Sequence, residues 1–431
     1  MTPNLALDQL RAAYSNRHPQ SAARFAEATS VMPGGNTRSV LYYDPFPLAI
    51  ARGDGSQLWD ADGHQYTDFI GEFTAGLYGH SHPVIREAII EALKGGINLT
   101  GHNLLEARLA ALITQRFASI RQLRFTNSGT EANLLAIAAA TRFTDRRRIL
   151  VFKGGYHGGV LTFAGGHSPI NVPHDFIIGR YNDLEDTAAL VAANAQQLAA
   201  IVVEPIQGAG GCIVGSPEFL HGLRRLASEV GALLIFDEVM SSRLSAGGRQ
   251  QLLGIEPDLT TLGKYIGGGM SFGAFGGRGD VMAQFDPRAP GHLSHAGTFN
   301  NNVMTMSAGI AGLTHLYTPE AAVALNARGD RLRERLNELC RMQEIDVQFT
   351  GLGSLMNVHG TSRPIRNCDD IPPDQRAVKD LFFFHMLEQG FYLARRGFIV
   401  LSLPLTDDDL EHFVAAFEGF VERYRNLLRK L

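Results

Sequence analysis

The residue with the clearest chemical potential in this chain is Lys264. It lies in residues 259–277 (LTTLGKYIGGGMSFGAFGG), which are rich in glycine and contain no other charged side chain. Burial in such surroundings lowers the pKa of a lysine and leaves a nucleophilic amine. A neutral amine forms Schiff bases with aldehydes, and pyridoxal phosphate (PLP) is the commonest aldehyde cofactor. The alternative is a loop lysine whose ammonium group reaches solvent.

An acidic residue, Asp237, directly follows a run of apolar residues. Residues 233–236 read LLIF, a pattern typical of a strand that is covered on both faces of a parallel sheet. Ligands of open α/β sheets bind at the carboxyl ends of such strands. A PLP enzyme needs a carboxylate there, because it keeps the pyridine nitrogen protonated and lets the ring accept electrons. A solvated strand end is the competing explanation.

A phosphate site is indicated in residues 126–133 (TNSGTEAN), at the expected start of a long helix. Ser128 and Glu131 have the S-x-x-E spacing of a capping box, and Gly129 permits close approach of an anion. A phosphate would meet free N–H groups, the positive helix end and the hydroxyls of Ser128 and Thr130. A plain helix cap is the alternative. The chain has no G-x-x-x-x-G-K-[ST] motif, which argues against an ATPase.

An aromatic residue, Tyr156, follows a Gly-Gly turn in residues 152–159 (FKGGYHGG), with His157 beside it. A ring in this position can lie flat over a planar cofactor by offset stacking. Ordinary packing of the tyrosine is the alternative.

The order of these four segments resembles the PLP-dependent aminotransferases of fold type I, specifically class III. The resemblance covers roughly residues 30–405 and includes GDGSQLWDADGHQYTDF (53–69), VVEPIQGAGG (202–211) and GTFNNN (297–302). Within class III the chain is similar to the glutamate-1-semialdehyde aminomutase branch. GGNTRSVL (34–41) and RRGFIVLSLPLTD (395–407) resemble most the bacterial β-phenylalanine (aromatic β-amino acid) aminotransferases.

This resemblance implies an α/β fold with two domains. The large PLP-binding domain, residues 70–315, would contain a mostly parallel seven-stranded sheet flanked by helices. The N-terminal segment 1–69 and the C-terminal residues 316–431 would together form a smaller α+β domain. The enzyme would be a homodimer with its active sites at the subunit interface.

The resemblance also assigns roles around PLP. Lys264 would hold the cofactor as a Schiff base and transfer the substrate proton, and Asp237 would contact the pyridine nitrogen. Val239 would cover the ring face opposite Tyr156. Thr298 would reach the phosphate bound by the neighbouring subunit. The full set of implied cofactor contacts is Ser128, Gly129, Thr130, Tyr156, His157, Glu204, Asp237, Val239, Lys264 and Thr298.

Two arginines, Arg38 and Arg396, carry the substrate prediction. A guanidinium binds a carboxylate in bidentate fashion, and the resemblance implies that both reach the active site. Tyr42 and Tyr43 follow Arg38 and could line an aromatic pocket, although packing is an equal alternative. The implied activity is transfer of an amino group from an aromatic β-amino acid to 2-oxoglutarate by a ping-pong aldimine/ketimine mechanism.

Two other functions remain open on the sequence alone. A glutamate-1-semialdehyde 2,1-aminomutase is an isomerase that needs no second carboxylate site, and Arg396 argues against it. A non-catalytic protein with this fold is disfavoured, because Lys264, Asp237 and the Ser-Gly-Thr motif are all present.

Composition excludes several other classes. The chain has 431 residues, of which 45% are hydrophobic and 19% charged, so it can bury a large core in two domains. A net charge of −4 gives no electrostatic case for nucleic acid. Three scattered cysteines indicate neither disulfides nor zinc. We expect no metal site, since His80 and His82 fit turn and helix-entry roles. No signal peptide or spanning segment is visible, so a cytoplasmic protein is expected.

The coarse pattern predicts the elements that position these residues. Residues 7–29 have helical spacing, and residues 47–69 read as strands with turns. From about 70 to 310, apolar strand runs alternate with helical stretches, as in a βαβ sheet. Clear strands are expected at 149–152, 200–204 and 233–237, and amphipathic helices at 320–345 and about 408–429.

Overall fold

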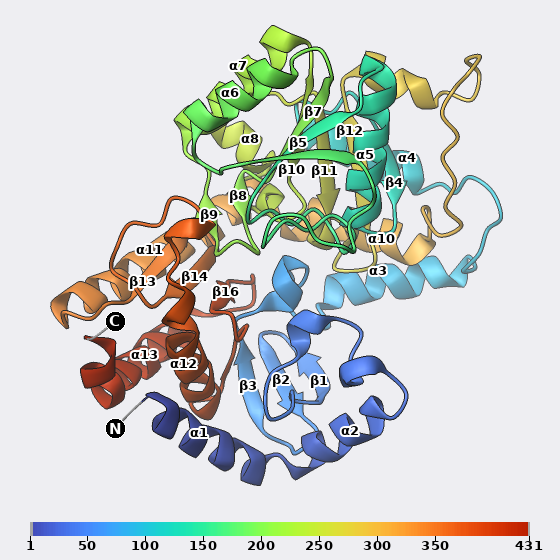
Figure 1. The fold of residues 1–431 in the computed structure, drawn as a ribbon. Helices are drawn as coiled ribbons and strands as arrows, with labels where there is room; N and C mark the ends of the chain where they lie inside the picture. The colour runs from blue at the N-terminus through green and yellow to red at the C-terminus, as the bar shows by residue number, and fades with distance from the viewer. Residues whose placement is uncertain (1–2, 430–431) are drawn as a thin grey trace.

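The computed structural model describes residues 3–429, which form two regions (Figure 1). The upper region in that view contains a large sheet with helices on both of its sides. The lower region contains both ends of the chain and smaller sheets. The chain therefore begins in the lower region, builds the upper one, and then returns.

The large sheet has seven strands in the order β4-β12-β11-β10-β7-β5-β6. Its strand β12 is antiparallel to both neighbours, whereas the pairs formed by β11, β10, β7, β5 and β6 are parallel. The predicted mostly parallel seven-stranded sheet is thus confirmed. Its strands are β4 (Gln122–Thr126), β5 (Arg148–Phe152), β6 (Asp175–Gly179), β7 (Leu198–Val203), β10 (Leu233–Asp237), β11 (Leu259–Gly263) and β12 (Gly273–Gly277).

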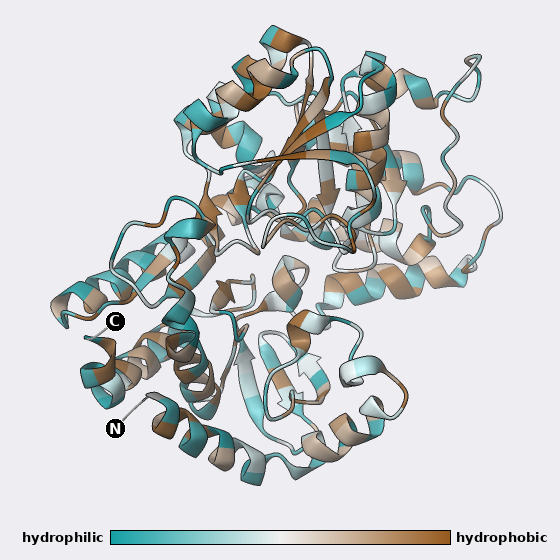
Figure 2. Ribbon diagram, viewed as in Figure 1, coloured by the Kyte–Doolittle hydropathy of each residue, from teal (hydrophilic) through white to brown (hydrophobic). Residues whose placement is uncertain are grey.

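Alternate residues of the central strands pack on opposite faces of this sheet. In β5, Ile149 and Val151 pack with helix α5 (Gly129–Thr144), whereas Leu150 and Phe152 pack with helix α7 (Pro217–Val230). Because successive side chains of a strand point to opposite faces, coverage on both sides requires an unbroken apolar sequence. Figure 2 shows the corresponding hydrophobic strands between helices whose outer sides are hydrophilic.

Further helices lie around this sheet and below it. They are α3 (Pro83–Lys94), α4 (Glu106–Arg116), α6 (Leu184–Asn194), α8 (Gly248–Leu253), α9 (Gly279–Met282) and α10 (Val303–Ala311). Strands β8 (Ile206–Gln207) and β9 (Ile213–Val214) form a short antiparallel pair.

A second sheet joins the two ends of the chain. Strands β1 (Ile50–Asp54), β2 (Gln57–Asp60) and β3 (Gln65–Asp68) are antiparallel, and β15 (Phe391–Tyr392) adds to β3 in parallel. The helical pattern over 7–29 forms two helices, α1 (Pro3–Arg17) and α2 (Pro19–Thr29). The break falls at His18 because the residue before a proline is disfavoured in the helical conformation.

A third sheet lies beside a cluster of phenylalanines. Strands β13 (Gln348–Leu352), β14 (Leu355–His359) and β16 (Phe398–Val400) are antiparallel. They accompany helices α11 (Pro319–Met342), α12 (Arg376–Glu388) and α13 (Asp407–Leu428). Helices α11 and α13 start and end close to the boundaries predicted from the sequence. Rings from β13, α12 and α13 meet at Phe349, Phe382, Phe417 and Phe420. None of the helices between residues 3 and 429 combines the length and apolarity needed to cross a bilayer.

Candidate active site

The lysine and the carboxylate singled out from the sequence lie at the ends of two adjacent strands. Asp237 is the last residue of β10, and it stands opposite Thr261 in the parallel strand β11. Lys264 follows the last residue of β11 and has a left-handed backbone with φ of 58°. This conformation is unusual for a residue other than glycine and is found preferentially at functional sites. Both residues therefore lie at the sheet edge where ligands of α/β proteins bind.

The environment of Lys264 favours its neutral form. The side chain is half-buried, and burial lowers its pKa to about 8, with the positive charge of Arg396 acting in the same direction. The nearby carboxylates of Asp237 and Glu204 oppose this effect without cancelling it. The amine is therefore partly unprotonated near neutral pH, as a Schiff-base lysine requires.

Asp237 is buried and held on both carboxylate oxygens. Its Oδ2 accepts hydrogen bonds from His157 Nδ1 at 2.8 Å and from Asn133 Nδ2 at 2.9 Å, and its Oδ1 accepts one from the Val239 N–H at 3.0 Å. Asn133 also accepts a hydrogen bond from Thr261. The Asp237 carboxylate is consequently fixed in position before any ligand arrives.

His157 forms a buried ion pair with Asp237. Burial by itself would lower the pKa of His157, but the hydrogen bond and the charge of Asp237 outweigh it, so this pKa lies above its usual value. The Asp237 carboxylate thus favours the protonated form of His157. The histidine predicted beside Tyr156 therefore lies behind the carboxylate and supports it.

Glu204 contributes a second buried carboxyl group near this edge. Burial raises its pKa to about 7, and the charge of Asp237 adds to the effect. Its two oxygens accept hydrogen bonds from the N–H groups of Tyr156 at 2.8 Å and Gly208 at 3.2 Å. Glu204 thus anchors the turn that carries Tyr156, whose ring is exposed at the same edge.

The predicted anion site forms the beginning of α5. Ser128 is the N-cap, and its Oγ accepts a hydrogen bond from the Glu131 N–H at 3.2 Å. The other half of the expected capping box differs, because the Glu131 carboxylate accepts from the N–H of Asn127 rather than of Ser128. The Thr130 hydroxyl accepts from the Gly159 N–H, which joins the start of α5 to the turn after His157.

Glycine is required at position 129 by a close approach. A Cβ there would lie 2.9 Å from the methyl groups of Val239, the half-buried residue two positions after Asp237. The helix N-terminus, with its unpaired N–H groups and positive dipole end, is therefore packed directly beside the strand that carries the carboxylate.

The residues at this edge fit PLP. A lysine amine with a lowered pKa matches the aldehyde, a buried carboxylate backed by His157 matches the pyridine nitrogen, and the α5 N-terminus matches the phosphate. The exposed Tyr156 ring and Val239 offer apolar surfaces for a flat ring.

The two predicted substrate arginines converge on one aromatic ring. The guanidinium carbons of Arg38 and Arg396 lie 5.8 and 5.2 Å from the centre of Phe73. Arg38 also forms an ion pair with Glu72 at 2.6 Å. Arg396 is half-buried, burial lowers its pKa, and its Nε has no hydrogen-bond partner within residues 3–429.

The turn that carries Arg396 is anchored by its neighbour Arg395. Arg395 binds the buried carboxylate of Asp380 through two hydrogen bonds of 2.6 and 2.8 Å. Gly397 has φ of 88°, and a Cβ there would lie 2.7 Å from Val358. Of the two consecutive arginines, one thus anchors the turn and the other is left available to a ligand.

The structure separates the two predicted tyrosines. Tyr42 is half-exposed, and its hydroxyl donates to Asp44 at 2.7 Å. Tyr43 is buried in the core, where its hydroxyl accepts from the Leu48 N–H and its ring contacts Phe383. Tyr43 therefore takes the packing role that the sequence left open.

Three functional candidates lay outside the sequence prediction. Asn133 falls inside the TNSGTEAN motif, but its partners Asp237 and His157 lie far away in the chain. Glu72 and Phe73 belong to a short turn, residues 71–74 (GEFT), that carries no local signature of a binding site.

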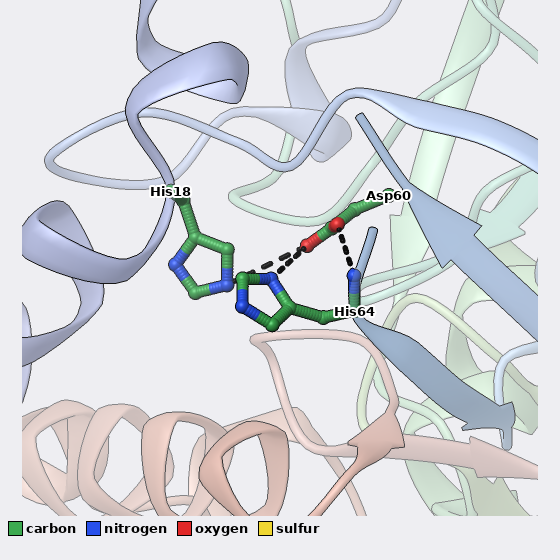
Figure 3. Close-up of side chains that lie close together, drawn as sticks. All are labelled: His18, Asp60 and His64. Atoms are coloured by element: carbon green, nitrogen blue, oxygen red, sulfur yellow. Dashed lines mark hydrogen bonds and ion pairs between the residues drawn. The ribbon is translucent and has the colours of Figure 1, made fainter. Parts of the chain in front are cut away.

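A cluster of His18, Asp60 and His64 lies in the lower region (Figure 3). Their side-chain atoms are close enough to share a metal ion, within 4.8 Å of one another. Each is also engaged in hydrogen bonds: His18 with Tyr14 O at 2.6 Å and with the Tyr66 hydroxyl at 2.9 Å, and Asp60 with His64 at 3.1 Å. The cluster ties the junction of α1 and α2 to the β2–β3 hairpin.

The two histidines weighed from the sequence have local roles. His80 contacts Asp68 through its Nε2 at 3.0 Å, and His82 caps α3 by accepting from the Val84 N–H. His82 thus lies at a helix entry, where the sequence pattern placed it.

Comparison with known proteins shows the family of this chain. Residues 41–421 match the family model described as "Aminotransferase class-III". The chain is 59% identical to the β-phenylalanine transaminase of Variovorax paradoxus, over 96% of this chain and 95% of that protein. It is 36% identical to the glutamate-1-semialdehyde 2,1-aminomutase of Desulforudis audaxviator, over 95% and 98% of the two chains.

A solved structure shows the same relationship. The crystal structure of a β-phenylalanine aminotransferase from Variovorax paradoxus superimposes with a TM-score of 0.98 at 58% identity, covering 99% of each chain. The fold is that of the PLP-dependent enzymes of fold type I. The chain belongs to the class III aminotransferases.

Proposed function

We propose that this aminotransferase moves the amino group of an aromatic β-amino acid, such as β-phenylalanine, to 2-oxoglutarate. The observation that carries the proposal is the pair of arginines on the Phe73 ring, beside a lysine with a lowered pKa. An enzyme that uses two carboxylate substrates needs such cations, and an aromatic wall suits a phenyl group. The 59% identity to a β-phenylalanine transaminase supports the same donor.

PLP, when bound, supplies an aldehyde that condenses with amines and a ring that accepts an electron pair from the substrate carbon. Lys264 Nζ would hold that aldehyde and, as a neutral amine, would take up and return the proton of the substrate's amine-bearing carbon. Asp237 would contact the pyridine nitrogen and hold a proton on it. His157 and Asn133 orient the Asp237 carboxylate through their hydrogen bonds to Oδ2.

Other residues bind and orient. The start of α5, with Ser128, Gly129 and Thr130, holds the phosphate. Tyr156 and Val239 would cover the two ring faces, and Glu204 fixes the Tyr156 turn. Arg38 holds the donor carboxylate, and Arg396 pairs with 2-oxoglutarate and yields its place to the aromatic group of the donor.

The proposal is tested by supplying single amino donors with 2-oxoglutarate to the purified protein. Formation of glutamate from 3-amino-3-phenylpropanoate supports it. Conversion of glutamate-1-semialdehyde to 5-aminolevulinate, with no reaction of 3-amino-3-phenylpropanoate, would establish the aminomutase that the 36% identical relative represents.

Replacing Arg396 by alanine should raise the KM for 2-oxoglutarate about ten- to a hundredfold. The reason is that charge-assisted hydrogen bonds to a carboxylate are worth about 1.5–3 kcal/mol, and Arg396 has no carboxylate partner of its own within residues 3–429. Stopped-flow half-reactions should show a smaller effect on an aromatic donor. Arg396→Lys keeps the charge but loses the planar fork. Its KM for 2-oxoglutarate should therefore lie between those of the wild type and Arg396→Ala. Equal slowing of the donor and acceptor half-reactions would refute the proposal that Arg396 pairs with 2-oxoglutarate and yields its place to the aromatic group of the donor.

The rate at which the apoenzyme takes up PLP should follow the pKa of Lys264. Because burial depresses that pKa from 10.5 to about 8, the neutral amine accumulates as pH rises from 6 to 8. Uptake should therefore rise up to about tenfold per pH unit and level off above pH 8. Absorbance after stopped-flow mixing measures the rate, with a free lysine derivative as reference. A rate that still climbs steeply above pH 9 would contradict the assignment.

We also infer that two chains form the active unit. Exposed apolar side chains gather on two adjoining loops, at Ile97, Leu99, Leu104 and Phe299. The loops are joined where Asn103 donates to Asn301 O at 2.6 Å. Thr298 lies exposed in the second loop, where it is free to reach the phosphate of a neighbouring subunit. Such apolar patches mark protein interfaces.

A further inference from the structure

A left-handed turn follows strand β3 beside the two arginines. Gly71, Glu72, Phe73 and Thr74 have φ values of 50°, 48°, 52° and 83°. Non-glycine residues seldom adopt this conformation, and consecutive ones persist only where the surroundings impose it. Here Asp68 accepts hydrogen bonds from the N–H groups of Ile70 and Gly71, and the Gly76 N–H donates to Gly71 O at 2.8 Å.

This backbone determines where two side chains lie. Glu72 reaches the guanidinium of Arg38 at 2.6 Å, and the next residue, Phe73, lies under the guanidinium groups of both Arg38 and Arg396. A regular right-handed turn would direct these side chains elsewhere. The strained conformation is therefore linked to the arrangement of the carboxylate-binding arginines.

Arg395 and Arg38 differ in how accessible their carboxylate partners are. Arg395 is bound in bidentate fashion by Asp380, whose side chain is 5% exposed, so this pair is shielded from solvent. Arg38 is bound by Glu72 with exposures of 44% and 58%, so this pair is accessible to an incoming anion. Exposed ion pairs are weak, and a ligand carboxylate of similar geometry can replace one.

We propose that Glu72 is an internal competitor for the substrate site: a carboxylate that occupies Arg38 until a substrate carboxylate displaces it. The inference rests on the proposed role of Arg38 in holding the donor carboxylate. A ligand with a carboxylate exchanges one ion pair for another. A ligand without a carboxylate leaves Glu72 in place and gains nothing from Arg38. Glu72 thereby lowers the affinity for every carboxylate ligand and keeps Arg38 charge-compensated between turnovers.

The test uses 3-phenylpropanoate, which carries the phenyl ring and carboxylate of the donor but no amine. Titration calorimetry with the PLP-loaded enzyme measures its Kd. Glu72→Gln keeps the shape of the side chain, and Glu72→Asn suits a left-handed backbone. Both should bind 3-phenylpropanoate roughly two- to fivefold more tightly than the wild type, since an exposed ion pair is the competitor removed. The uncharged 3-phenylpropanamide should bind equally to all three.

Two further variants separate this inference from the proposed function. Arg38→Ala should weaken 3-phenylpropanoate about tenfold. Glu27→Gln removes a similar exposed Arg–Glu pair on α2 and should change nothing. If Arg38→Ala weakens binding but the Glu72 variants do not tighten it, the internal-carboxylate role is wrong and the role of Arg38 stands. If the Glu72 variants bind more weakly, Glu72 orients Arg38 instead. If Arg38→Ala has no effect, the proposed substrate site fails as well.

Discussion

Replacing Lys264 by alanine should decrease the kcat of transamination by a factor of about 100 to 10,000 or more. That range is the usual contribution of one positioned proton-transfer group, and Lys264 also supplies the covalent attachment. Lys264 directly follows β11, beside the strand that ends at Asp237, and this position places its amine at the proposed cofactor site.

The measurement combines steady-state activity with borohydride reduction of the PLP-loaded protein. Wild-type enzyme should be labelled on the peptide that contains Lys264, whereas the variant should bind PLP without covalent labelling. Lys153→Ala, which removes a half-exposed lysine paired with Asp369, serves as the control and should remain active. Full turnover by Lys264→Ala would remove this residue from the mechanism.

Replacing Asp237 by asparagine should slow transamination at least about 100-fold. Asparagine keeps the shape of the side chain but cannot hold a proton on the pyridine nitrogen by charge, and proton and charge effects of this kind span several kcal/mol. The buried His157 would also lose the partner that keeps it charged. The change should appear in the single-turnover rate with a saturating donor.

A matched control is available at the next position. Glu238 is also buried, but its carboxylate accepts hydrogen bonds from Ser241 and from the N–H groups of Arg249 and Gln250. Glu238→Gln should therefore alter thermal stability more than the chemical rate. Near-normal activity of Asp237→Asn would mean that Asp237 only terminates a strand.

The large sheet could be predicted because its signal is local. Strands covered on both faces require continuous apolar residues. Such residues directly precede Asp237 and also occupy positions 149–152. Polar residues at the ends of these strands then fall at one edge. The S-x-x-E spacing likewise places Ser128 at a helix start, although the Glu131 carboxylate turned out to bind the residue before the cap.

The contacts that join distant segments could not be predicted from local patterns. Asn133 reads as part of a helix start, and only the packing of α5 on the sheet brings it to Asp237. The GEFT turn contains no glycine after residue 71, so nothing in its sequence indicates a left-handed backbone. Tyr42 and Tyr43 are adjacent and chemically alike, yet Tyr42 faces solvent and Tyr43 faces the core.

The parallel pairing of β15 with β3 has a consequence for synthesis on the ribosome. Asp68 is made about 320 residues before its partner Tyr392. At translation rates of about 5–20 residues per second, the edge of β3 waits roughly 15 to 65 s for its neighbour. An unpaired strand edge is a template for wrong pairing during that interval. The nascent N-terminal hairpin is therefore a segment for chaperones to shield until the C-terminal strand emerges.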